Sequence, residues 1–319
     1  MNLVLYSDDA TEAEWFKNLN PSFRKLKSNL ILPRGKNIKI INEIVKYDRP
    51  DIILLNGSIP ILVVEKTREV PTGHNVGQRM ARLVRALELK IPTIYFFPFD
   101  ARKHGEHTGI CNMNARVLFA FKNMWKIHDC PIVALNWITD EGGELIGDGS
   151  EDVEIIKIIK ELEEESFSSK SKIYNKLRVD NKNEYLKRIK LRKSYSKKPA
   201  SVYQIKTNDL VQKFKKKLSK KSNERLMKCN DSIIYKIVMS EAKCKRQDPY
   251  TGTQFIYDYC YCRKGKNIND KKMNLILYFP EIRKNVWLEK NPNNLDTKSS
   301  NWYLIANALM FKDDILILR

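Results

Sequence analysis

The chain has 319 residues, of which 42% are hydrophobic and 30% are charged. This composition is typical of a globular protein and excludes a disordered chain, and the length suits one large domain or two ordinary ones. The 58 Lys and Arg residues outnumber the 38 Asp and Glu residues, which gives a formal net charge of +20. An excess of this size indicates a polyanionic partner, such as nucleic acid.

Other classes of protein are disfavoured by the distribution of apolar residues and cysteines. No window approaches the roughly 18–20 continuous apolar residues that a membrane span needs. The first residues lack the basic leader and apolar core of a signal peptide. The six cysteines are unevenly spaced and do not form a disulfide framework. We therefore expect a soluble protein of a reducing compartment, the cytoplasm of a prokaryote or of the host cell of a virus, without a membrane partner.

Hydrophobic periodicity in the first 150 residues predicts alternating strands and helices. Strands are expected at 2–7, 29–32, 51–55, 61–67, 92–98 and 131–137. Helices are expected at 12–19, 38–46, 75–89 and 112–126. This order predicts an α/β domain with a mixed central sheet flanked by helices.

A glycine-rich turn before residue 150 suggests a boundary between a first domain, 1–150, and a second domain, 151–319. An amphipathic helix is expected at 151–167, directly after the turn. Further along, the pattern predicts strands at 255–261, 273–279 and 314–318 and helices that begin at Thr207 and span 300–311. The second domain is therefore expected to be α+β with a core of its own.

Nearly all of the excess positive charge lies in one segment of the second domain. Residues 1–150 contain 20 basic and 17 acidic residues, whereas residues 169–228 contain 21 basic and 4 acidic residues. In the helix that begins at Thr207, Lys213, Lys216 and Lys217 fall on the solvent side. The density predicts a surface that contacts DNA phosphates, with an affinity that falls as salt rises. A solvated lysine-rich surface without a ligand is the alternative.

Two carboxylates in apolar strands are the candidates for chemistry. Asp51 opens one strand and Glu65 lies in the next, and a buried carboxylate is costly unless a metal or hydrogen bonds compensate it. If residues 56–60 form a five-residue loop, Asp51 lies opposite Glu65 and both point to the same side of the sheet. A tight turn at Asn56 and Gly57 is the competing register and would separate them. Pro60 disfavours the tight turn, because a proline in a central strand cannot donate to the ladder. Two convergent carboxylates suit Mg²⁺.

This pattern resembles the PD-(D/E)XK nuclease family, which includes many restriction endonucleases. The resemblance covers roughly residues 38–137: Pro50 and Asp51, a hairpin to Glu65, and then helix, strand, helix and strand. It implies a restriction-endonuclease-like core in which Asp51 and Glu65 bind Mg²⁺. It also implies a lysine two residues after the acidic residue, where this chain has Thr67.

Several residues are candidates to replace the missing lysine. Lys66 is adjacent, but in a regular strand its side chain points to the opposite face. Gln78, early in the following helix, matches a glutamine that some nucleases with this core place near the metal. Glu43, on the preceding helix, matches an acidic residue of some members, although a solvent-facing glutamate is the simpler interpretation. Lys66, Gln78 or a phosphate oxygen of the substrate would position the attacking water.

Further residues are candidates for DNA contacts. Arg79 and Arg82 lie on the helix that carries Gln78. In the second domain, Tyr257 and Tyr259 are expected on one face of an aromatic strand, where they would either stack on bases or pack a small core. Arg263 and Lys264 follow that strand and would contact phosphates.

The sequence as a whole predicts a two-domain, Mg²⁺-dependent DNA endonuclease of the restriction type that hydrolyses double-stranded DNA as a homodimer. Two alternatives remain open: a nucleic-acid-binding protein with a degenerate nuclease core, and a repair or recombination nuclease that recognises DNA structure.

Overall fold

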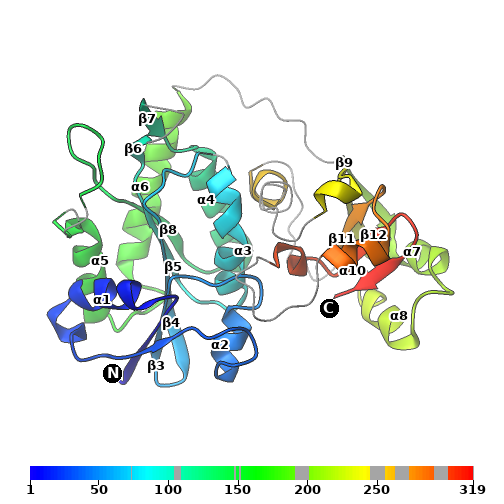
Figure 1. Cartoon of the computed structure of the whole chain (residues 1–319), viewed down its shortest axis with the longest axis horizontal. Coiled ribbons are helices and arrows are strands. Elements are labelled where there is room, and N and C mark those ends of the chain that lie inside the picture. The colour runs from blue at the N-terminus through cyan, green and yellow to red at the C-terminus, as the bar shows by residue number, and fades with distance from the viewer. Residues whose placement is uncertain are drawn as a thin grey trace.

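The computed structural model describes residues 1–72, 74–103, 109–146, 149–150, 152–190, 201–244, 256–262, 273–290 and 301–318. Two sheets with their own helices lie along the long axis of the molecule (Figure 1). Among the described residues, none of the helices has the length and apolar character that a membrane crossing requires.

The first sheet has six strands in the order β2-β1-β3-β4-β5-β8. Their bounds are β1 (Leu3–Ser7), β2 (Lys27–Leu30), β3 (Ile52–Asn56), β4 (Ile59–Lys66), β5 (Thr93–Phe97) and β8 (Ile132–Asn136). Strand β3 is antiparallel to both of its neighbours, whereas β1–β2, β4–β5 and β5–β8 are parallel pairs. The expected mixed sheet is therefore confirmed.

Helices cover both faces of this sheet, because its central strands are apolar on both sides. Ile52, Leu54 and Val64 face one apolar cluster, and Ile53 and Val63 face another. The first cluster is completed by α1 (Ala10–Asn18), α5 (Val153–Glu164) and α6 (Lys172–Ile189). The other side is covered by α2 (Lys39–Ile44), α3 (His74–Glu88) and α4 (Arg116–His128).

The long helix α6 closes the edge of the first sheet. The side-chain amide of Asn181 donates to the carbonyl oxygen of Ala134 and accepts from its backbone nitrogen, both at 2.8 Å. One side chain thus satisfies backbone groups of the edge strand β8. Because α5 and α6 both belong to the first sheet, the boundary expected near residue 150 does not coincide with the change from one sheet to the other. That change falls between Ile189 and Ser201.

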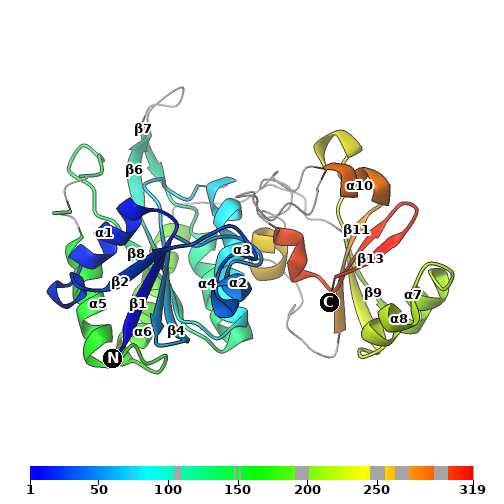
Figure 2. The same cartoon turned by 60° about the horizontal axis from the view of Figure 1, so that its bottom comes forward.

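The second sheet has five strands in the order β13-β12-β11-β10-β9. Their bounds are β9 (Ser201–Lys206), β10 (Asp231–Lys236), β11 (Met273–Phe279), β12 (Ala308–Phe311) and β13 (Ile315–Ile317). Helices α7 (Thr207–Lys213) and α8 (Lys220–Leu226) cover its outer face (Figure 2). Its inner face shares one continuous apolar core with α3 and α4 of the first sheet. The two sheets are therefore joined by buried side chains and not only by the chain between them.

Two elements of the second half differ from the sequence expectation. The aromatic segment is a π-helical turn, Ile256–Tyr261, and not a strand. The expected helix at 300–311 is a 3-10 turn, Trp302–Ile305, followed by strand β12. In β12 every residue is buried between β11 and β13, and a short apolar run of this kind has no periodicity that separates strand from helix.

The remaining described elements are short. Strands β6 (Asp100–Lys103) and β7 (Gly109–Asn112) pair with each other, and Asn112 ends β7, so the helix expected at 112–126 begins only at Arg116. The others are η1 (Pro21–Phe23), η2 (Glu241–Lys243) and α10 (Lys284–Lys290).

Candidate functional site

Asp51 and Glu65 are brought together by a hairpin with a bulge. Strand β3 turns into β4 through Gly57 and Ser58, with Asn56 paired to Ile59, so the expected five-residue loop is wrong. Gly57 has a φ of +61°, which a glycine adopts without strain. The tight turn alone would place Asp51 opposite Val64.

A one-residue shift in the pairing corrects this register. Leu55 pairs with Pro60, but Leu54 pairs with Leu62, so Ile61 is the extra residue of a β-bulge. Ile52 consequently pairs with Val64, and the next position outward sets Asp51 against Glu65. The expected juxtaposition of the two carboxylates is therefore present, and it results from a bulge instead of a five-residue loop.

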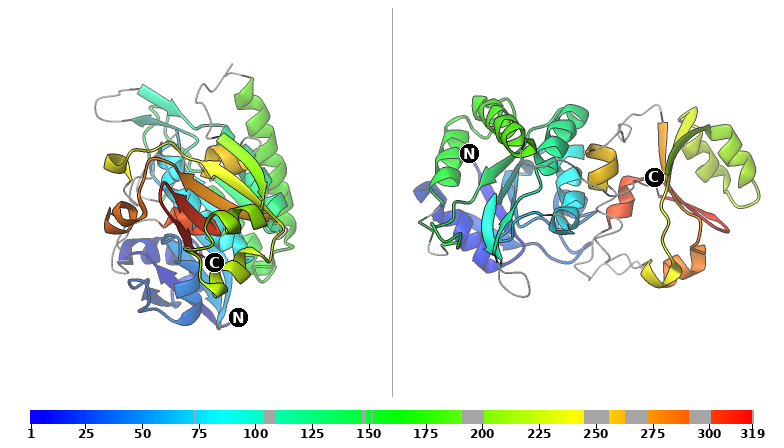
Figure 3. Two further views of the ribbon diagram at one scale, coloured as in Figure 1. Left: turned by 90° about the vertical axis from the view of Figure 1, so that its right-hand side faces the viewer. Right: turned by 90° about the horizontal axis from the view of Figure 1, so that it is seen from above.

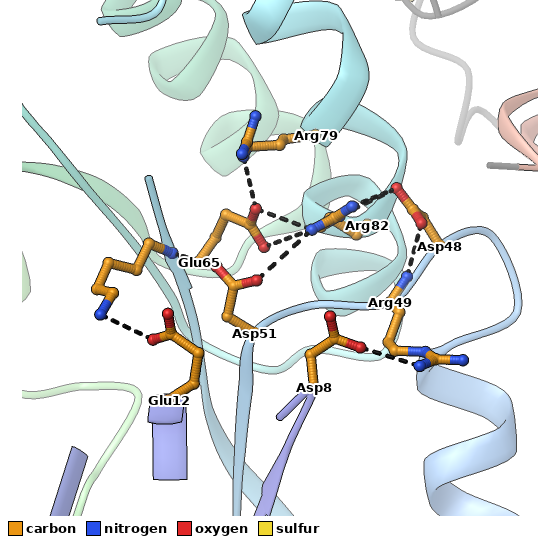
Figure 4. A network of polar contacts seen from close by, with 9 residues as sticks. Asp8, Glu12, Asp48, Arg49, Asp51, Glu65, Arg79 and Arg82 are labelled. Carbon is orange, nitrogen blue, oxygen red and sulfur yellow. Dashed lines mark hydrogen bonds and ion pairs between the residues drawn. The ribbon is translucent and has the colours of Figure 1, made fainter. Parts of the chain in front are cut away.

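Two arginines of α3 hold Glu65, which has no exposed surface (Figure 4). Arg82 donates from Nη1 to both carboxylate oxygens of Glu65, at 2.9 and 3.1 Å. The Nε of Arg79 lies 2.9 Å from Oε1 of the same carboxylate. Arg82 also donates from Nε and Nη2 to Oδ2 of Asp48, at 3.0 and 2.8 Å. The two arginines that were expected to contact DNA are thus directed toward buried carboxylates.

Asp51 lies beside this network at the start of β3. Its Oδ2 accepts a hydrogen bond of 2.7 Å from the backbone nitrogen of Lys66, and its Oδ1 is 3.9 Å from Nη1 of Arg82. Burial raises the pKa of Asp51, against the effect of Arg82. Burial also raises the pKa of Glu65 to about 8, against the effects of Arg82 and Arg79 and with that of Asp51.

The carboxylate oxygens of this site suit a hard cation, but much of their negative charge is already compensated by the arginines. Asp48, Asp51 and Glu65 carry three negative charges when ionised, and Arg79 and Arg82 carry two positive charges. Among the described residues, no group of three or more His, Cys, Asp or Glu side chains is arranged to hold a metal ion. A Mg²⁺ ion here would take one or two carboxylates and complete its shell with water and substrate phosphate, as Mg²⁺ commonly does.

A cleft of about 850 Å³ opens beside Asp51 and receives side chains from α1, β4 and α3. Lys66 lines this cleft, but its side chain leaves the strand on the face opposite Glu65, as a regular strand requires. Its Nζ lies 2.9 Å from Oε2 of Glu12 and 4.2 Å from the ring centre of Trp15. Trp137 is the second aromatic ring near this ammonium, at 5.5 Å.

Besides Asp48, which binds Arg82, Glu12 is a site residue that the sequence did not indicate. It lies in the first turn of α1, where its backbone nitrogen donates to the N-cap Asp9 at 2.9 Å. Burial raises the pKa of Glu12, against the effect of Lys66. The spacing of Asp9 and Glu12 marks a helix start. Nothing in that pattern indicates a cleft formed with a strand more than fifty residues later.

The remaining residues that the resemblance singled out are Glu43, Thr67 and Gln78. Glu43 does not face the cleft, because its Oε2 is 2.6 Å from Nη2 of Arg85. Thr67 is buried, and its hydroxyl accepts from the backbone nitrogen of Glu69 at 3.1 Å. Gln78 lies in α3, and its side chain is outside the described part of the chain.

The exposed lysines of the second sheet that were predicted to contact DNA lie far from this site. Lys213, Lys216 and Lys217 are exposed at α7 and the turn after it, as expected. In Figures 1 and 2 α7 and α8 form the end of the molecule remote from α1 and β4, and the right-hand view of Figure 3 shows the same separation. Arg263 and Lys264 lie outside the described residues. One copy of the chain therefore presents its acidic site and this lysine surface at separate places.

Of the two alternatives for the aromatic segment of the second domain, core packing is the one found for Tyr257. Tyr257 is 1% exposed and belongs to the core between the two sheets, so it does not present a face to a base. Tyr259 lies in the same π-helical turn, and its side chain is outside the described part of the structure.

Comparisons with family models, curated proteins and solved structures returned no match to this chain.

Proposed function

We propose that the protein is a Mg²⁺-dependent DNA endonuclease with a restriction-endonuclease-like core, acting on double-stranded DNA as a homodimer. The observation that carries this proposal is the alignment of Asp51 and Glu65 at one edge of a mixed sheet, beside an open cleft. Helix α3 follows β4 and leads into the parallel strand β5, which agrees with the order of elements that the resemblance implies.

Some of the site residues would bind the metal ion, and others would bind the DNA phosphate. Asp51 and Glu65 would hold Mg²⁺, which when bound polarises a phosphate and makes a water molecule more acidic. Arg79 lines the cleft and is placed to neutralise the phosphate that enters it. Lys66, held by Glu12, adds positive charge on the other wall and is our candidate for orienting the attacking water in place of the motif lysine.

The basic surface of α7 would retain a duplex at a distance from the cleavage site. Exposed lysines there contribute affinity through phosphate contacts without a base-specific signal. Because this surface and the acidic site are separate, a long duplex, or two copies of the chain on one duplex, would be needed to engage both.

A direct test is cleavage of a panel of plasmid and phage DNAs in the presence of Mg²⁺. Wild type should give fragments, Glu65→Gln should give none, and Glu14→Gln should behave like wild type. Glu14 is the matched control, because it lines the same cleft but is paired with Lys17 at its rim. Discrete fragments would support a sequence-specific enzyme, and cleavage confined to branched or damaged DNA would support a repair nuclease.

A nucleic-acid-binding protein with a degenerate core is the second candidate. It is favoured by Thr67 at the lysine position and by the guanidinium groups on both oxygens of Glu65. Salt-sensitive DNA binding with no cleavage, unchanged in Glu65→Gln, would establish this candidate and overturn the nuclease.

A further inference from the structure

The two arginines at Glu65 are held in different ways. Arg82 uses Nε and Nη2 on Asp48 and Nη1 on Glu65, so its whole guanidinium is committed to buried carboxylates. In the described part of the chain Arg79 contacts a carboxylate only as an ion pair, with Nε 2.9 Å from Oε1 of Glu65 and without the geometry of a hydrogen bond. The side chain of Arg79 is 22% exposed and lines the cleft. The guanidinium of Arg79 can therefore move from Glu65 into the cleft. The guanidinium of Arg82 cannot move in this way, because the buried carboxylate of Asp48 would lose its hydrogen bonds to Nε and Nη2.

The charge balance shows what this departure would change. With both arginines in place, Asp48, Asp51 and Glu65 carry a net charge of one negative unit when ionised. Without Arg79, the same carboxylates around Arg82 carry two negative units, which matches a divalent cation. The position that Arg79 Nε occupies on Oε1 is also one at which a cation would bind. Arg79 therefore opposes Mg²⁺ through both its charge and its position.

A DNA phosphate in the cleft offers Arg79 a different partner. A guanidinium presents parallel N–H donors that match two phosphate oxygens, which is a stronger arrangement than one contact through Nε. Arg79 is in the same helix as Arg82 and one turn before it, so a change of side-chain rotamer moves the guanidinium without moving the helix.

We propose that Arg79 is a latch that couples DNA binding to Mg²⁺ binding. In the free protein Arg79 holds Oε1 of Glu65 and keeps the affinity for Mg²⁺ low. When a phosphate enters the cleft, Arg79 transfers to it, and Oε1 becomes available to the metal. This inference rests on the proposed function, because it takes Asp51 and Glu65 as the metal ligands. By linkage, Mg²⁺ must strengthen DNA binding by the same factor by which DNA strengthens Mg²⁺ binding.

The test is calorimetric titration of Mg²⁺ into the full chain, with and without a random-sequence phosphorothioate duplex that resists hydrolysis. Wild type should bind Mg²⁺ at least about tenfold more tightly with the duplex than without it, within the range of ordinary coupling. Arg79→Met should bind Mg²⁺ in the free protein about tenfold more tightly than wild type, and the duplex should add little. Arg79→Gln is a second uncharged variant that serves if the first does not fold.

Arg68→Met is the matched control, because Arg68 is an exposed arginine that lines the same cleft. It should leave Mg²⁺ binding by the free protein as weak as in wild type, whereas a gain equal to that of Arg79→Met would overturn a specific latch. If wild type binds Mg²⁺ equally with and without duplex and cleaves DNA, the latch is overturned and the proposed function stands. If neither wild type nor the Arg79 variants bind Mg²⁺ under any condition, the proposed function fails and the latch fails with it.

Discussion

Arg82 donates to both carboxylate oxygens of Glu65 while its two remaining nitrogen groups hold Asp48. This one side chain fixes the position of Glu65 at the end of β4 and compensates two buried carboxylates. A buried carboxylate is costly without such a partner, so Arg82 determines whether the site can exist in the folded protein.

Replacing Arg82 should therefore destabilise the protein strongly. Arg82→Met leaves Asp48 and Glu65 without their main counter-charge, and breaking a buried ion pair costs roughly 3–5 kcal/mol of unfolding free energy. Urea denaturation measures the change. Arg82→Met combined with Asp48→Asn and Glu65→Gln should recover part of the loss, because positions 48 and 65 then no longer carry buried negative charges. An Arg82→Met variant as stable as wild type would show that the network does not hold the site.

Replacing Asp51 should remove catalysis with little effect on DNA binding in the absence of Mg²⁺. Asp51→Asn keeps the shape of the side chain but removes one charge from the proposed Mg²⁺ site. Loss of several kcal/mol of metal-derived stabilisation corresponds to a cleavage rate lower by roughly a hundredfold or more. Single-turnover cleavage with Mg²⁺ and a gel-shift assay without Mg²⁺, on the same DNA, separate the two effects. Cleavage by Asp51→Asn at the wild-type rate would remove this residue from the mechanism.

Mg²⁺ binding should strengthen as the pH rises through 8. Burial raises the pKa of Glu65 to about 8, and the carboxyl must lose its proton before it can bind a cation. Calorimetric Mg²⁺ titrations into the free protein, in which Arg79 contacts Glu65, should differ by up to about tenfold in affinity between one unit below and one unit above pH 8. Glu65→Gln should abolish this dependence. An affinity that is equal at both pH values would contradict the raised pKa.

The same raised pKa should make the metal-free protein less stable as the pH rises, whereas it makes Mg²⁺ binding stronger. Between the ordinary pKa of a glutamate and about 8, the folded chain keeps the proton of Glu65 that the unfolded chain has released. Stability therefore decreases as the pH rises across this interval. Urea denaturation at several pH values, compared between wild type and Glu65→Gln, isolates the contribution. A difference between the two proteins that stays constant with pH would contradict it.

The lysines of α7 should act on DNA affinity and not on the metal site. The triple variant Lys213→Gln, Lys216→Gln and Lys217→Gln removes three exposed charges far from the cleft. DNA binding should weaken. The negative slope of log affinity against log salt should become shallower by about 0.9 for each DNA phosphate that is no longer neutralised. Calorimetry should show unchanged Mg²⁺ binding by the free protein. An unchanged salt slope would show that these lysines form only a solvated surface.

The first sheet was predictable because its strands and helices have clear periods and clear ends. The apolar runs that became β3, β4 and β5 and the periodic helix α3 were expected from the sequence alone. The alignment of Asp51 with Glu65 was also expected, but the loop was wrong. A bulge at Ile61 depends on pairing with β3, and hairpin rules based on turn residues do not predict it.

The partners of Glu65 could not be predicted, because they depend on distances between segments that are far apart in the chain. Arg79 and Arg82 have the composition of a DNA-binding helix face, and only the fold shows that their guanidinium groups point to Glu65. Likewise, Tyr257 belongs to an aromatic run that suits a strand, but it is buried in a π-helical turn between two sheets. In both cases tertiary contacts override a local pattern.

Asp51 and Glu65 should hold a divalent cation when DNA is bound, and Mn²⁺ can report this through its anomalous scattering. Crystals of the full chain with a phosphorothioate duplex and Mn²⁺ should show an anomalous peak between the two carboxylates, with Arg79 turned toward a phosphate. Glu65→Gln crystals grown in the same way should lack the peak. An ordered duplex in the cleft, with no Mn²⁺ at Asp51 and both arginines still on Glu65, would contradict the account.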